Sequence, residues 1–132
     1  MNTKILMTAS SVILGISGII LTFIPQEISV GLGIGGNKLV EFLLQILGGL
    51  YFGFAMLNWM TRSGLIGGIY NRPIATANFT HFMISGLALT KGITADPVFP
   101  IAIWLVVIIY CVFAVSFGVL LFRHPVADKD PK

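Results

Sequence analysis

The chain has 132 residues, enough for one domain. Hydrophobic residues make up 56% of it and charged residues only 10%, whereas water-solvated domains carry roughly 25% charge. This composition excludes a soluble globular domain and predicts a protein whose surface lies mostly in lipid. The net charge of +3 comes from scattered single residues, which argues against a nucleic-acid partner.

Residues 5–24 form the first long apolar stretch, which carries no charge and stops at Pro25. A bilayer core of about 30 Å needs roughly 20 apolar residues in a helix, so we predict a membrane helix here. A signal peptide is the alternative, but no A-x-A cleavage site follows the stretch. Ser11, Gly15 and Gly18 predict a helix-packing face, because small side chains let two backbones approach closely.

The loop after this helix is rich in glycine, and its GLGIGG segment (31–36) matches the pattern G-x-G-x-x-G. That pattern indicates a dinucleotide site only between a strand and a helix, so we interpret it as a turn. A second membrane helix is predicted at residues 40–60. Glu41, near its outer end with Gln45 one turn further on, could bind a proton or a cation. The favoured interpretation is a carboxylate that is solvated or caps the first turn of the helix.

Two sets of residues recur at helical spacing on this second helix. Gly48, Tyr51, Ala55, Asn58 and Arg62 follow one another at intervals of three and four, which predicts a single stripe. Gly49 and Gly53 form a small-xxx-small pair that predicts close helix packing.

The third predicted helix, residues 74–90, is the shortest and most polar. Asn78, His81 and Ser85 share one of its faces by spacing. Polar groups at membrane depth face a bundle interior or a wet cavity, so they predict either interhelical hydrogen bonds or a binding pocket. The opposite face, which can meet lipid, carries Phe79, Phe82 or Met83, and Leu87.

The fourth predicted helix, residues 98–122, is the longest and most apolar. Ala114 and Gly118 form another small-xxx-small pair. Cys111, the only cysteine, is interpreted as an inert buried thiol. A short polar tail follows.

Four spans give an asymmetric distribution of basic residues. One side would hold Lys4, Arg62, Arg72, Arg123, Lys129 and Lys132. The other side would hold only Lys38 and Lys91. Because basic loops stay in the cytoplasm, we predict both termini there, with the chain in the inner or plasma membrane.

The segments ISGIILT (16–22) and ISGLALT (84–90) resemble each other. They suggest two parallel-related helical hairpins, as in some transporters. The predicted fold is therefore all-α: one integral membrane domain over residues 1–132, folded as a four-transmembrane-helix bundle.

Depth in the membrane places several polar residues at the same cytoplasmic level, where a pocket could bind a lipid, a quinone or a fatty acid. The candidate ligand-binding residues are Tyr51, Asn58, Arg62, Arg72, Asn78, His81 and Ser85. We expect no metal site, because His124 lies too near the surface to join His81 and metals need several convergent ligands. No catalytic residue set is evident.

The segment LLQILGGLYFGFAMLNW (43–59), the first helix ending at a proline and the NRP that opens the third helix resemble the DoxX-like group of small four-helix membrane proteins and its relatives. The resemblance implies a four-helix bundle. It implies function poorly, since that group is linked to quinone-coupled redox partners and to assembly or chaperone roles.

Three functions remain open. The first is a non-enzymatic subunit that assembles with another membrane protein or with itself, and it needs no cofactor. The second is a binder or carrier of a quinone, lipid or other amphiphile. The third is a proton-coupled transporter, which the absence of a carboxylate from the first helix disfavours. We expect no enzymatic activity.

Overall fold

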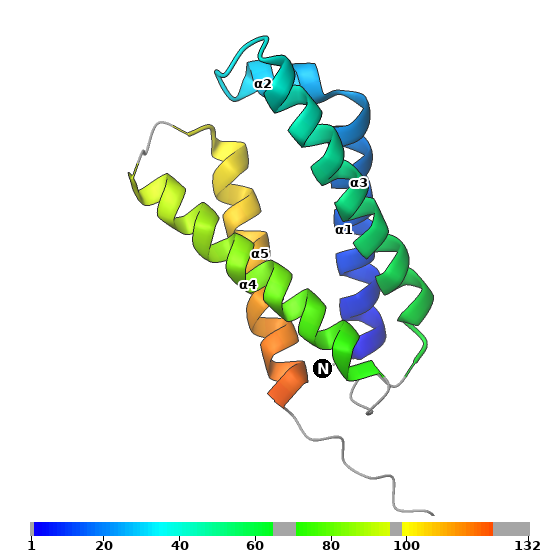
Figure 1. The fold of residues 1–132 in the computed structure, drawn as a ribbon. Coiled ribbons are helices and arrows are strands. Elements are labelled where there is room, and N and C mark those ends of the chain that lie inside the picture. The colour runs from blue at the N-terminus through cyan, green and yellow to red at the C-terminus, as the bar shows by residue number, and fades with distance from the viewer. Residues whose placement is uncertain (1, 65–70, 96–98, 123–132) are drawn as a thin grey trace, which may run out of the picture. The chain divides into compact units, whose positions relative to one another are not determined.

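The structure, a computed structural model, describes residues 2–64, 71–95 and 99–122. Their secondary structure is helical, as predicted, in the order α1 (Thr3–Phe23), α2 (Pro25–Gly31), α3 (Lys38–Thr61), α4 (Arg72–Ala95) and α5 (Ile101–Phe122). The chain divides into two compact units, Met1–Ser63 and Gly64–Lys132. The first unit contains the antiparallel hairpin of α1 and α3, and the second contains that of α4 and α5 (Figure 1).

In the part of the chain that the structure describes, three helices are long and apolar enough to cross a membrane: α1, α3 and α5. They confirm the coarse prediction of a multi-pass membrane protein. α4 has 24 residues and continues past the predicted end at Thr90, but it is not one of the three. The polar residues of α4 lower its mean hydropathy, which is why it differs from the three candidate spans.

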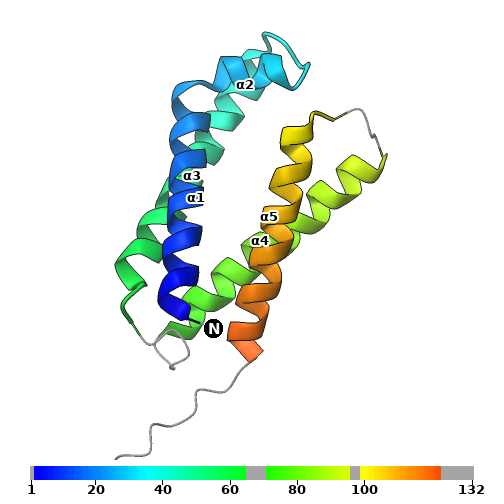
Figure 2. The same ribbon diagram turned by 180° about the vertical axis from the view of Figure 1, so that it is seen from behind.

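The short helix α2 corrects the prediction that a loop alone joins the first two membrane helices. Pro25 begins it, where a fixed φ and a missing N–H suit the first helical position. α2 lies across one end of the α1–α3 hairpin in both views (Figures 1 and 2). Gly33, Gly35 and Gly36 then take positive φ angles, which glycine adopts readily, in the segment interpreted as a turn.

The backbones of α1 and α3 meet at two glycines. A Cβ built on Gly18 would lie 2.8 Å from both the Gly48 carbonyl oxygen and the Phe52 nitrogen. A Cβ on Gly48 would meet the Gly18 oxygen at 2.7 Å and also the Thr22 hydroxyl. Only glycine fits at these two positions, so they fix how closely the helices pack.

The predicted packing residues of the first hairpin lie in two different places. Ser11 Oγ donates a hydrogen bond of 2.8 Å to the carbonyl oxygen of Ala55, and a Cβ on Gly15 would contact the Ala55 side chain. Gly49 and Gly53 take no part in the close contact with α1, because a Cβ on either would have open space around it. The close contact on α3 is made by Gly48 instead.

The hairpin of α4 and α5 is held by aromatic packing. Phe82 of α4 is fully buried and stacks on Phe113 and Phe117 of α5, with ring centroids 4.8 and 5.7 Å apart. Ala114 is also buried, whereas Cys111 is exposed, which corrects the prediction of a buried thiol. A Cβ on Gly118 would lie 3.0 Å from the Phe79 ring, so a small residue makes room for an aromatic one.

The two similar segments have the same local geometry. Thr22 Oγ1 donates to the Gly18 oxygen, and Thr90 Oγ1 donates to the Gly86 oxygen, both at 2.8 Å. Each glycine is buried in its own hairpin, and a Cβ on Gly86 would meet Tyr110 of α5 at 3.6 Å. The resemblance between the segments therefore extends from sequence to structure within each hairpin.

The neighbouring glycines of α3 provide a matched test of this packing. We predict that Gly48→Ala lowers the free energy of unfolding by about 1–3 kcal/mol, because the new methyl group forces the helices apart. Gly49→Ala should leave it unchanged or raise it by up to about 1 kcal/mol, because alanine favours helix and the position is open. Unfolding in mixed detergent micelles, followed by circular dichroism, measures both. Equal effects at the two positions would contradict the close contact.

Candidate functional site

Asn58, a predicted ligand-binding residue, lies inside the first hairpin. Its side chain is 0% exposed, and Nδ2 donates to Ser10 Oγ of α1 at 3.0 Å. Ser10 Oγ in turn donates to the carbonyl oxygen of Met7 at 3.1 Å. The amide thus links α1 to α3, where no water is available to solvate it.

Arg62 follows the last residue of α3 and folds back over its own helix. Its guanidinium carbon lies 3.4 Å from the centre of the Trp59 ring, and Nη1 donates to the Trp59 oxygen at 3.2 Å. A cation at a helix C-terminus is favoured by the helix dipole. Tyr51 is half-buried on α3, one turn before Ala55.

The polar residues of α4 do not share one environment. Asn78 is fully buried, and its Nδ2 donates to the Ile74 oxygen of the same helix at 3.0 Å. His81 is half-buried, and its Nε2 lies 3.5 Å from the Tyr110 hydroxyl of α5 in a hydrogen bond whose donor depends on the tautomer. Ser85 is half-buried, and Arg72 is exposed at the start of α4.

The buried face of α4 differs from the face that the polar residues suggested. It runs through Ala75, Asn78, Phe82, Gly86 and Ile93. Of the two residues considered for the lipid-facing side, Met83 is exposed and Phe82 is buried. Phe82 enters the core because the large flat rings of α5 offer it a stacking surface.

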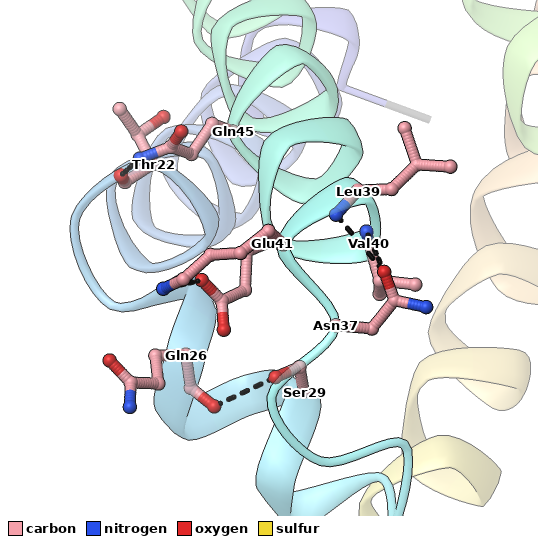
Figure 3. A network of polar contacts seen from close by, with 9 residues as sticks. Thr22, Gln26, Ser29, Asn37, Leu39, Val40, Glu41 and Gln45 are labelled. Carbon is pink, nitrogen blue, oxygen red and sulfur yellow. Dashed lines mark hydrogen bonds and ion pairs between the residues drawn. The ribbon is translucent and has the colours of Figure 1, made fainter.

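Glu41 forms an ion pair with Lys38 and lies in a corner formed by α2 and α3, beside Ser29 and Gln26 (Figure 3). The burial of Glu41 contradicts a solvated carboxylate, whereas the residue does lie in the first turn of α3, where the helix dipole favours an acidic side chain. The side chain is buried, with 7% of the residue exposed, and the cap of α3 is Asn37, whose Oδ1 accepts from Leu39 and Val40. The α2 helix, absent from the predicted fold, explains this burial.

The structure places the predicted pocket residues in two separate units. Tyr51, Asn58 and Arg62 belong to the first hairpin, and Asn78, His81 and Ser85 belong to the second. Their convergence stays a prediction. The basic residues Arg123, Lys129 and Lys132, together with His124 and Val98, lie outside the described residues.

Two further features bear on what the site could hold. An apolar groove of about 460 Å³ runs between α1 and α3 and is lined by Gly18, Ile19, Thr22, Phe23, Gly49 and Phe52. It lies towards the α2 end of the hairpin, away from Asn58. Within the described ranges, no three His, Cys, Asp or Glu side chains gather as metal ligands.

Comparison with known proteins finds no matching family model, curated protein or solved structure. The resemblance to the DoxX-like group therefore stays a prediction. The candidate site rests on the geometry of the two hairpins alone.

The link between Asn58 and Ser10 can be measured by a double-mutant cycle. We predict that Asn58→Ala and Ser10→Ala together cost less stability than the sum of the two single variants. The coupling should be about 0.5–1.5 kcal/mol, as for hydrogen bonds between membrane helices. Thr22→Ala with Ser10→Ala is the control pair and should be additive, because the two residues lie about three turns apart on α1. A coupling near zero for Asn58 and Ser10 would show that the bond contributes nothing.

Proposed function

We propose that the chain is a four-span membrane protein that acts as a non-enzymatic interaction subunit of a membrane complex, with both termini in the cytoplasm. Three candidate spans support a membrane location. The 24 residues of α4 would extend about 36 Å as a helix, more than the thickness of the hydrocarbon core. An even number of spans also puts most basic residues on one side.

The polar residues of α4 are compatible with a place in lipid. The hydroxyls of Thr76, Thr90 and Thr94 donate to carbonyl oxygens one turn earlier in the helix, and Asn78 donates to Ile74 in the same way. Such bonds satisfy polar side chains without water. A helix of modest hydropathy can then cross the bilayer when its neighbours cover it.

The observation that carries the interaction role is the contrast between the two sides of α3. On the side towards α1, Asn58 and Ala55 are buried and form hydrogen bonds with serines of α1. The other side, here called the open face of α3, is exposed and carries two glycines among large apolar side chains. It consists of Ile46, Gly49, Leu50, Gly53, Met56 and Met60.

In lipid, an exposed apolar residue has no need of a partner, but a pair of glycines four residues apart lets a second helix approach closely. Gly49 and Gly53 have this spacing, and both have open space above them. We therefore assign the open face of α3 to another transmembrane helix, supplied by a partner membrane protein.

A second candidate is the binding of an apolar chain of a lipid or quinone. The groove beside Gly18 and Phe52 favours it, because its lining is apolar and it is large enough for part of an acyl chain. Such a ligand would lie near the α2 end of the hairpin, away from the polar cluster that the sequence suggested.

Gly53→Leu separates partner binding from folding. We predict that this variant keeps the stability of the wild type, because a side chain there meets no atom of the chain, but loses the co-purifying membrane protein by about tenfold or more, since a bulky residue blocks a close helix. Val12→Leu, on the exposed side of α1, is the matched control and should keep the partner. Crosslinking in native membranes followed by mass spectrometry measures both.

Two outcomes would reject the interaction role. One is a partner that binds Gly53→Leu and the wild type equally. The other is a wild type that carries only lipid or quinone, which would favour the second candidate. A wild type that crosslinks only to its own copies would replace the partner protein by a homo-oligomer.

A further inference from the structure

One oxygen of the Glu41 carboxylate is buried without a hydrogen-bond partner. Oε2 forms an ion pair of 2.9 Å with Lys38 Nζ. Oε1 has no hydrogen-bond partner within the described ranges, although the residue is only 7% exposed. An ionised carboxylate only accepts hydrogen bonds, and a buried acceptor without a partner is unfavourable. The oxygen therefore needs a positive or hydrogen-donating group.

The groups opposite Oε1 belong to α2. Figure 3 shows the carboxylate of Glu41 pointing towards Ser29 and Gln26. Ser29 is fully buried, and its hydroxyl proton is used in a 3.0 Å bond to the Gln26 carbonyl oxygen. The remaining lone pairs of Ser29 Oγ can act as a second oxygen ligand, so α2 offers an oxygen atom on the side towards which the carboxylate points.

Lys38 neutralises the carboxylate only from the solvent side. Its side chain is 83% exposed, and the ion pair joins residues three apart on the first turn of α3. Exposed pairs of this kind are weak and are screened by salt. Lys38 can therefore move away without disturbing the fold, and it leaves Oε1 unpaired even when it is in place.

We propose that the corner between α2 and α3 is a binding site for a small monovalent cation, with Glu41 as its charged ligand and Ser29 Oγ as a neutral one. Hard cations prefer oxygen ligands. A single carboxylate matches one positive charge, and no cluster of three acidic, His or Cys side chains exists among the described residues to hold a metal ion of higher charge. Sodium is the probe that fits this set. The site is independent of the proposed partner surface.

The test titrates Na⁺ against the unfolding midpoint of the purified full chain in detergent, with N-methylglucamine keeping the ionic strength constant. A bound cation stabilises the folded state, so the midpoint should rise by about 3–6 °C once Na⁺ reaches ten times its Kd. Glu41→Gln should abolish the rise. Glu27→Gln removes the exposed carboxylate of α2 and should respond as the wild type does.

Two more variants keep the test decisive if Glu41→Gln does not fold. Lys38→Met removes the competing ammonium and should lower the apparent Kd for Na⁺ at least about threefold. Ser29→Ala should raise it, because one oxygen ligand is lost, and broadening of the ²³Na NMR signal measures both values directly. A wild type with no Na⁺-dependent rise would overturn the proposal, as would an equal response in Glu41→Gln or an unchanged Kd in both Lys38→Met and Ser29→Ala.

Discussion

The contact between the α1 and α3 backbones at Gly18 and Gly48 is the constraint on which the first hairpin depends. Where these glycines bring the helices together, short polar side chains can reach across. Ser11 then bonds to the Ala55 carbonyl oxygen, and Asn58 bonds to Ser10. In lipid there is no water to replace these bonds, so close packing and polar pairing support each other. Residues of α3 that do not face α1, among them Gly53, are exposed.

In the second hairpin, aromatic rings hold the two helices together. Phe82 stacks on α5 rings, and the His81 and Tyr110 side chains meet in a polar contact beside it. In lipid no hydrophobic effect drives the two helices together, and dispersion between the large rings stabilises their contact instead. The glycine of each ISG segment thus lies in a different packing environment: Gly18 meets the α3 backbone too closely for any Cβ, whereas a Cβ on Gly86 would lie at an ordinary contact distance from Tyr110.

The sequence predicts the all-α class and the apolar helices well, because length and hydropathy report directly on membrane spans. It predicts helix faces less well. Lipid and the protein interior are both apolar, so a membrane helix such as α5 shows no contrast between its buried and lipid-facing sides. For the same reason the spacing of apolar residues on α4 does not reveal that Phe82 is buried. The burial of Glu41 depends on α2, a helix too short to show a period. The small residues of α1 correctly predict a close contact at Gly18. On α3 the small-xxx-small pattern predicts the contact at Gly49, whereas it lies at Gly48.

The number of membrane crossings is the central claim, and labelling from outside intact cells tests it most directly. Single cysteines in a Cys111→Ala background report the side of each segment to a membrane-impermeant maleimide. With four spans, Gly35→Cys is labelled in intact cells, whereas Ser63→Cys and Lys132→Cys react only after the membrane is permeabilised. Labelling of Lys132→Cys in intact cells, with Ser63→Cys protected, would show that α4 does not cross and would contradict the account.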